Sequence, residues 1–125
     1  MLRYVAAIAN GGILAEPTFL KGGSGGKTTP LLNPATALRL QELMRNNVTA
    51  HYEEEVDFSG LPFCAKTGTA ETGAGTSHSW FTGFLQDEEH PYAFVAVIEE
   101  GGFGLWAAGL MVNDIFQHML KTGTA

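Results

Sequence analysis

Two apolar segments joined by a short polar turn constrain the fold of this chain more than any other feature. Ser79–Leu85 and Tyr92–Glu99 are each long enough for a strand, and the connection Gln86–Pro91 is short and polar. This pattern predicts a β-hairpin. Every position from Tyr92 to Ile98 is apolar, which is typical of a strand buried on both faces. A third segment, Phe63–Thr69, predicts one more strand of an antiparallel sheet.

The sequence before these strands predicts two helices. Leu2–Asn10 is rich in Ala, Val and Ile, and the two glycines that follow it supply a helix end. The stretch Ile13–Lys21, interrupted by Pro17, is predicted to be extended. A second helix is predicted to begin at Asn33, a good N-cap, with Pro34 suited to the first helical position. Its apolar positions follow at helical spacing: Leu38, Leu40, Leu43, Met44 and Val48.

A last helix is predicted from about Leu105 to Leu120. Its apolar residues form one stripe at helical spacing, which should pack on one face of the sheet: Leu105, Ala108, Gly109, Val112, Ile115, Phe116 and Met119. The acidic run Glu53–Glu55 is predicted to be solvated. The order of two helices, three antiparallel strands and a helix indicates an α+β fold.

The composition narrows the classes of function. The chain has 125 residues, 45% of them hydrophobic and 16% charged, which is typical of one globular domain with a modest core. A net charge of -6 without a basic cluster argues against nucleic-acid binding, because the phosphate backbone demands Lys and Arg. The single cysteine excludes an intrachain disulfide, and the histidines lack ligand spacing, so no metal or cofactor is expected: His51, His78, His90 and His118.

No apolar run reaches the roughly 18 to 20 residues that a membrane helix needs. The sequence opens abruptly on residues with helical character. We therefore expect a fragment of a longer protein.

The glycine-rich stretch Gly22–Gly26 is typical of a flexible loop, and its linker-like composition also suits an engineered splice. With Lys27 after it, the stretch is similar to a phosphate-binding loop. However, Lys21 stands where the first glycine is needed, and Pro30 interrupts the helix that should follow. Ser24 and Lys27 also match a Ser-x-x-Lys nucleophile pattern. The surrounding glycines cannot hold the two side chains in a fixed geometry, so we predict a loop without a catalytic role.

Three other residues or pairs allow two interpretations each. Cys64 has apolar neighbours, which favours a small buried side chain over a reactive thiol. His78 precedes a strand and is either a loop histidine or part of a cleft. Trp80–Phe81 belongs either to the core or to a ligand platform, and the core is favoured.

The pentapeptide Lys-Thr-Gly-Thr-Ala occurs twice, and its context separates the copies. Lys66–Ala70 follows apolar residues on a predicted strand. Lys121–Ala125 follows the last turn of a predicted helix, where Lys121 is a helix-end cation and Gly123 can end the helix. The second copy therefore predicts a frayed tail, and any chemistry is expected at the first.

The sequence resembles the C-terminal part of the transpeptidase domain of high-molecular-weight penicillin-binding proteins. Tyr4–Pro17 is similar to the helix and turn after the second active-site motif of that family. Cys64–Glu71 resembles its Lys-Thr-Gly strand, and Ser79–Phe84 the strand that follows. The resemblance covers nearly the whole chain. It implies part of a β-lactamase-like fold and of a serine D,D-transpeptidase that cross-links peptidoglycan through an acyl-enzyme.

The resemblance also implies roles for single residues. Lys66 would help to position, and electrostatically support, the substrate and the serine of the family's Ser-x-Asn motif. The hydroxyls of Thr67 and Thr69 would bind the terminal carboxylate of a D-Ala-D-Ala stem peptide or of a β-lactam, because charge-assisted hydrogen bonds are strong. Gly68 would let the substrate backbone approach closely. The N–H of Thr69 would be one donor of an oxyanion hole.

The chain departs from the family in what it lacks. The family's nucleophilic serine and its Ser-x-Asn motif have no counterpart in this sequence, so we expect the 125 residues alone to be inactive. Two further strands of the family's sheet are also missing. One edge of Tyr92–Glu99 should then be unpaired, and exposed edges recruit partners. We therefore expect the fragment to self-associate by edge pairing or by swapping, and we expect the missing N-terminal part of the domain to be its partner in the parent.

Two alternatives to a piece of the enzyme remain. A β-lactam sensor or receptor could use the same fold, and a structural protein could carry the pentapeptide on a strand. For the enzyme, the family implies a membrane-anchored parent at the extracytoplasmic face of the bacterial cell membrane.

Overall fold

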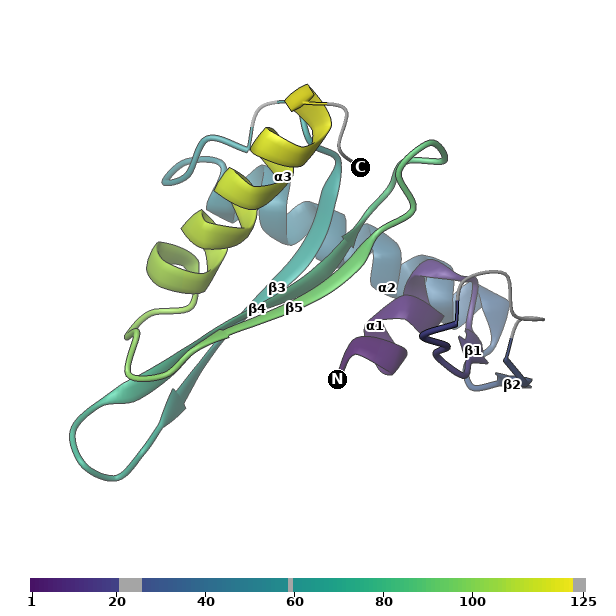
Figure 1. Cartoon of the computed structure of the whole chain (residues 1–125), viewed down its shortest axis with the longest axis horizontal. Coiled ribbons are helices and arrows are strands. Elements are labelled where there is room, and N and C mark those ends of the chain that lie inside the picture. Colours follow the sequence, from purple (N-terminus) through teal and green to yellow (C-terminus); the bar gives the residue numbers. More distant parts are fainter. Residues whose placement is uncertain (21–25, 59, 123–125) are drawn as a thin grey trace.

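The computed structural model describes residues 1–20, 26–58 and 60–122. Three helices, two π-helical turns and five strands follow one another through these residues (Figure 1). In chain order they are α1 (Leu2–Ala9), β1 (Ile13–Ala15), β2 (Thr28–Pro30), α2 (Pro34–Asn47), the π-helical turn η1 (Val48–Tyr52), β3 (Phe63–Glu71), β4 (Ser77–Leu85), β5 (Ala93–Ile98), the π-helical turn η2 (Leu105–Gly109) and α3 (Leu110–Thr122).

The three predicted strands form one antiparallel sheet in the order β3-β4-β5. Lys66 lies opposite Thr82, and Phe81 lies opposite Ala96. The predicted α+β fold and the predicted hairpin between β4 and β5 are confirmed. Strands β3 and β4 extend two residues beyond the prediction, to Glu71 and from Ser77.

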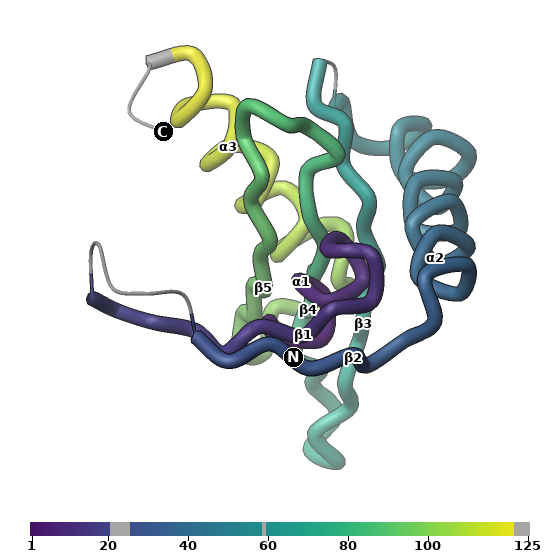
Figure 2. The backbone as a smooth tube through the Cα atoms, turned by 90° about the vertical axis from the view of Figure 1, so that its right-hand side faces the viewer, coloured from purple at the N-terminus to yellow at the C-terminus, as the bar shows by residue number. Residues whose placement is uncertain are grey.

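Helices lie on both faces of the sheet, with α3 on one face and α1 on the other (Figure 1). On the α3 face, the ring of Phe63 lies 5.4 Å from those of Phe58 and Phe116 and 5.6 Å from that of Phe94. On the α1 face, a smaller cluster joins Cys64 and Phe84 to Val5 and Met44. Helix α2 runs beside β3 (Figure 2). The alternation of side chains along a strand gives the sheet these two apolar faces.

One prediction for the sheet is wrong. Strand β5 is not buried on both faces: only Ala96 is buried, and Val97 is 40% exposed. Within the described residues β5 pairs with β4 alone, so it is an edge strand. The apolar sequence of β5 therefore predicts more burial than the described residues provide.

The N-terminal helix ends as predicted, and the chain turns through Gly11 and Gly12 with positive φ. The extended stretch contains β1, which pairs with β2 in a small sheet that the sequence did not predict, because each strand has only three residues. Most of the predicted glycine-rich loop, with Ser24, lies outside the described residues. The same holds for residues 123–125 of the second pentapeptide.

The start of α2 is confirmed, since the Asn33 side chain accepts a hydrogen bond from the Ala35 N–H at 2.9 Å. Its apolar face is only partly as predicted: Met44 and Val48 are buried, whereas Leu38 and Leu43 are 55% and 46% exposed. The acidic run 53–55 is exposed, as predicted.

The last helix begins with the wider π-helical turn η2. Of the predicted stripe, Leu105, Ala108, Gly109, Val112 and Phe116 are buried, whereas Ile115 is 47% exposed. On the same helix the polar Asn113 is buried, and its side chain donates a hydrogen bond to the carbonyl of Asp57 at 2.9 Å. The apolar pattern could not predict that a polar residue would be buried there.

Candidate functional site

The outer edge of β3 is the feature on which the site is built. Alternate residues of an edge strand direct their N–H and C=O groups away from the sheet. Along β3 these are Phe63, Ala65, Thr67 and Thr69. At the first two, α2 supplies the partners: Arg45 Nη1 donates to the Phe63 carbonyl at 3.0 Å, and Asn47 Nδ2 donates to the Ala65 carbonyl at 3.1 Å.

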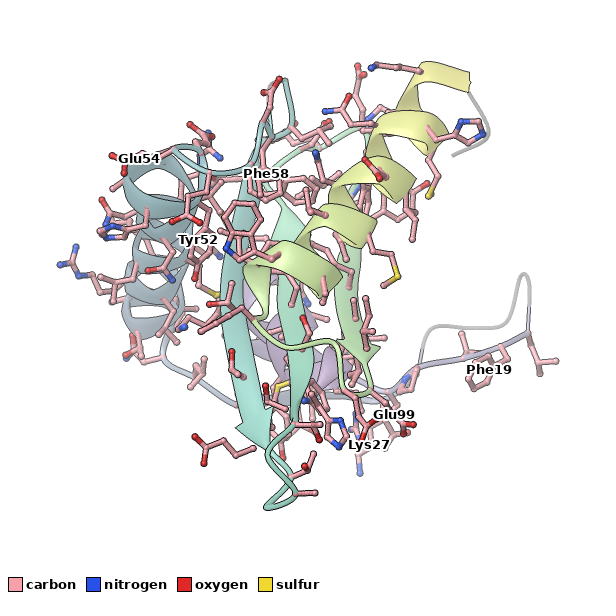
Figure 3. The ribbon with its side chains drawn as sticks, turned by 90° about the vertical axis from the view of Figure 1, so that its left-hand side faces the viewer. Phe19, Lys27, Tyr52, Glu54, Phe58 and Glu99 are labelled. Carbon is pink, nitrogen blue, oxygen red and sulfur yellow. The ribbon has the colours of Figure 1, made fainter. Side chains whose placement is uncertain are left out.

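At Thr67 the partner is Tyr52, the last residue of η1. The Thr67 N–H donates to Tyr52 Oη at 3.2 Å, and the two side-chain oxygens, Tyr52 Oη and Thr67 Oγ1, are also 3.2 Å apart. The half-buried Tyr52 ring lies edge-on to that of Phe81, 6.2 Å between centroids. Figure 3 shows Tyr52 against the sheet between α2 and α3.

Thr67 and Thr69 project from the same face of β3, because every second side chain of a strand lies on the same face. Both line a hollow of about 390 Å³, here called the threonine groove. Its other walls come from η1, from the turn that follows η1 and from the segment that leads into α3: His51, Tyr52, Glu55, Phe103, Gly104, Leu105 and Trp106. Two hydroxyls side by side at the open edge of a strand can donate to an anion.

The floor of the threonine groove is closed by a second set of hydrogen bonds. The Gly104 N–H donates to Thr69 Oγ1 at 3.4 Å. The buried Ser79 hydroxyl lies 3.1 and 3.2 Å from the carbonyls of Phe103 and Gly104, and it accepts from the Ala108 N–H at 3.0 Å. These contacts hold the start of η2 over the sheet.

Lys66 lies on the opposite face of β3, and its side chain reaches back to the edge. Its Nζ donates to the Thr67 carbonyl at 2.9 Å and lies 3.5 Å from Thr67 Oγ1. The side chain is exposed. A positive charge therefore stands at the rim beside the first of the two hydroxyls.

Gly68 is enclosed by the chain itself. A Cβ at Gly68 would lie 3.2 Å from Trp80 Cβ, and one at Gly104 would lie 2.6 Å from the Gly68 carbonyl oxygen. A side chain at Gly104 would therefore force η2 away from the sheet, and one at Gly68 would press on Trp80 of β4. The predicted approach of a substrate backbone to Gly68 stays a prediction.

The first pentapeptide thus brings Lys66, Thr67, Gly68 and Thr69 to one strand edge. Sequence reasoning missed Tyr52, Glu55 and Gly104, which no motif marks. The one signal was Ser79, a polar residue within an apolar strand.

The remaining candidates lie elsewhere or are structural. Cys64 is fully buried, and burial raises the pKa of its thiol to about 11, which makes it an inert core residue as predicted. Phe81 belongs to the core, while Trp80 is half-buried. His78 Nδ1 accepts from the Glu100 N–H at 3.1 Å, away from the groove.

Two larger hollows, of about 570 and 590 Å³, adjoin α1 and β1 on the other side of the sheet. Among the described residues, no three His, Cys, Asp or Glu side chains are grouped so that they could hold a metal ion. In the same part of the chain, none of the helices has the length and apolarity needed to cross a membrane.

Comparison with known proteins shows the family of this chain. The family model for the penicillin binding protein transpeptidase domain matches residues 1–121. A curated relative, the peptidoglycan D,D-transpeptidase PbpA of Mycolicibacterium smegmatis, is 30% identical over 86% of this chain and 25% of its own length.

Solved structures give the same fold. Penicillin-binding protein A from M. tuberculosis, as an imipenem acyl-enzyme complex, has a TM-score of 0.78 at 23% identity and covers 95% of this chain and 29% of its own. The D,D-transpeptidase domain of a peptidoglycan glycosyltransferase from Eggerthella lenta has a TM-score of 0.75 at 25% identity, over 99% of this chain and 32% of its own. This chain thus spans a quarter to a third of these relatives. It belongs to the penicillin-binding protein transpeptidase domain family.

Proposed function

We propose that residues 1–125 form the C-terminal part of a peptidoglycan D,D-transpeptidase domain. In this proposal the edge of β3 binds the terminal carboxylate of a stem peptide ending in D-Ala-D-Ala, or of a β-lactam. The observation that carries the proposal is the pair of hydroxyls of Thr67 and Thr69 in one groove with the Lys66 Nζ at its rim. A carboxylate accepts hydrogen bonds only, so hydroxyl donors beside a cation are the right partners.

The reaction would be an acyl transfer with a serine from the rest of the domain as nucleophile. The serine oxygen attacks the carbonyl carbon of the penultimate D-Ala, and the terminal D-Ala leaves as an amine after taking up a proton. The Thr69 N–H, next along the open edge from that of Thr67, would stabilise the developing oxyanion, an interaction that contributes about 3 kcal/mol in comparable hydrolases. Lys66 would hold the substrate and support the charge, and Gly68 would leave room for its backbone.

The role of Lys66 can be tested in the complete transpeptidase domain that carries this segment. Lys66→Ala should lower the rate of acylation by a fluorescent penicillin by about a hundredfold or more, while circular dichroism and melting temperature stay close to wild type because the side chain is exposed. Removing residues 121–125 is the matched control and should leave labelling unchanged. Undiminished labelling of Lys66→Ala would refute the assigned role.

The same protein separates a transpeptidase from a receptor, since only the former releases D-Ala and forms a cross-linked product from stem peptides. By contrast, the 125 residues alone should form no covalent adduct with a penicillin in intact-mass measurements, because they contain no activated serine. An adduct mapped to Ser24 would contradict this and restore the Ser-x-x-Lys interpretation.

Two further parts of the proposal concern the surroundings of the chain. We infer that the parent acts at the extracytoplasmic face of the bacterial cell membrane, where its substrate lies, and that it is anchored there.

We also infer that the isolated chain self-associates through β5. The Leu85 N–H donates to the Tyr92 carbonyl, so by the period of two the groups of Ala93, Val95 and Val97 face outward. Unpaired groups of this kind recruit a further strand.

A further inference from the structure

We propose that Tyr52 is a positioning residue of the threonine groove: its phenol O–H donates to Thr67 Oγ1, so that the Thr67 proton is directed at the carboxylate of the ligand. This inference rests on the proposed function of Thr67 and Thr69 as carboxylate ligands. It adds to their strand a residue from η1, fifteen positions away in sequence.

The phenol oxygen of Tyr52 has two contacts, both with Thr67. The Thr67 N–H can only donate, so at 3.2 Å it occupies one acceptor position of Tyr52 Oη. The phenol keeps its own proton, and Thr67 Oγ1 lies 3.2 Å away. Either oxygen of this pair could be the donor on distance alone.

Two observations indicate that Tyr52 Oη is the donor and Thr67 Oγ1 the acceptor. A phenol O–H is a stronger hydrogen-bond donor than an aliphatic hydroxyl. In addition, the Lys66 Nζ, which has no acceptor, lies 3.5 Å from the same Thr67 Oγ1. A threonine oxygen has two acceptor positions and one proton. With a donor at each acceptor position, the proton of Thr67 points away from both and into the threonine groove.

The hydroxyl of Thr69 also accepts a hydrogen bond from the protein, but from a different donor. The Gly104 N–H, which can only donate, lies 3.4 Å from Thr69 Oγ1. Both hydroxyls therefore accept from the protein and donate to the groove. An ionised carboxylate matches two such donors, and each bond is strengthened by the donor behind it. The ester of the same acid loses the charge, so the arrangement favours an acid over its ester.

Tyr52→Phe is a clean test of this role. The ring packs against Phe81, so phenylalanine keeps the apolar contact and removes only the oxygen. Tyr92→Phe is the matched control, because Tyr92 packs on the same core with its ring 6.0 Å from that of Phe116 and does not line the groove.

The experiment compares benzylpenicillin with its methyl ester. Second-order acylation rates are measured with each compound on the complete transpeptidase domain as wild type, Tyr52→Phe and Tyr92→Phe. We expect the ratio of the acid rate to the ester rate to fall by about tenfold in Tyr52→Phe, as for loss of one charge-assisted hydrogen bond. The ratio should stay within about twofold of wild type in Tyr92→Phe. Because both rates are measured on the same protein, a misfolded fraction lowers them equally and leaves the ratio unchanged.

The outcomes separate this inference from the proposed function. If wild type reacts equally fast with acid and ester, carboxylate binding by the groove is refuted. If wild type prefers the acid and Tyr52→Phe keeps that preference, the role of Tyr52 is refuted alone. A uniform slowing with both compounds would also refute it, because it would indicate a purely structural effect.

A second measurement uses the 125-residue chain without any ligand. The Thr67 amide should exchange with solvent deuterium about tenfold faster in Tyr52→Phe than in wild type, because its acceptor is removed. Unchanged exchange would show that the Thr67 N–H is not bonded to Tyr52 and would overturn the inference at its first step.

Discussion

At the residue scale, the threonine groove contains one side chain that opposes its proposed ligand. Glu55 lines the groove together with Thr67 and Thr69, and two negative charges in one hollow repel each other. The opposite charge of Lys66 stands at the rim and acts against this repulsion. We therefore expect Glu55 to weaken the binding of an anionic ligand in this groove.

Replacing this carboxylate should improve recognition of an anionic ligand. We expect Glu55→Gln to raise the rate of acylation by benzylpenicillin in the complete domain by about two- to threefold at low salt, and less at high salt because of screening. Glu54→Gln, an exposed neighbour that does not line the groove, should have no such effect. An equal response of both variants would point to a change in net charge rather than to the groove.

Ionisation of the Cys64 thiol should make the stability of the fold depend on pH in the alkaline range. Burial raises the pKa of its thiol from 9.0 to about 11, although the charge of Arg45 acts in the opposite direction. As the pH rises past 9, the unfolded chain loses this proton before the folded chain does. The contribution of the buried neutral thiol is thus complete below pH 9 and is lost toward pH 11.

The free energy of unfolding should accordingly fall by about 2 to 3 kcal/mol across that interval. Urea denaturation of wild type and Cys64→Ala as a function of pH measures the effect. Cys64→Ala should lack this part of the alkaline decline, since alanine has no proton to lose. Parallel curves for the two proteins would show that the thiol pKa is not raised by folding.

At the scale of elements, the edge of β3 is shared between a helix and an open site. Helix α2 satisfies the carbonyls of Phe63 and Ala65 through Arg45 and Asn47, and η1 continues the same path to Thr67. Both π-helical turns border the threonine groove. The wider turn of η1, closed by the Glu53 N–H on the Val48 carbonyl, contributes His51 and Tyr52 to the lining of the groove. Such turns are frequent at functional sites.

The helix–strand contact can be measured through neighbouring asparagines. Asn47→Ala removes the donor to the Ala65 carbonyl and should lower the free energy of unfolding by about 1 kcal/mol relative to Asn46→Ala. Asn46 is exposed on the same helix, so both variants gain the same helix propensity from alanine. Urea denaturation of the 125-residue chain gives the difference. Equal stabilities would mean that Asn47 does not stabilise the strand edge.

At the scale of the whole molecule, β5 forms one edge of the sheet within the described residues. The outer edge of β5 faces away from β4, and the apolar Val97 is 40% exposed there. The edge of β3 differs, because α2 and η1 cover much of it. Association between copies should therefore use β5.

Charge at this edge should suppress association. Sedimentation velocity of the 125-residue chain should show concentration-dependent oligomers for wild type and a shift to monomer for Val97→Lys, because a lysine on an edge strand opposes pairing. Ile115→Lys is the control, since Ile115 is similarly exposed but lies on α3. A monomeric wild type at high concentration would contradict the proposed self-association.

Much of this molecule could be predicted from short stretches of sequence. The strands β3, β4 and β5, the Asn33 cap of α2 and the apolar stripe of α3 follow from patterns that repeat every two to four residues, and such patterns depend on near neighbours. The pentapeptide at Lys66–Ala70 also stood out from its copy at the C-terminus through its immediate context. These local patterns indicated the fold class and the strand that carries the site.

The contents of the threonine groove could not be predicted in this way. Tyr52 meets Thr67 across 15 positions, and Gly104 meets Thr69 across 35, distances at which no periodic pattern operates. The exposure of β5 was also missed, because an apolar strand sequence is the same whether or not a neighbour covers it. Chain packing places η1 and η2 at the rim of β3, and hydrogen bonding at that edge then selects which polar groups meet.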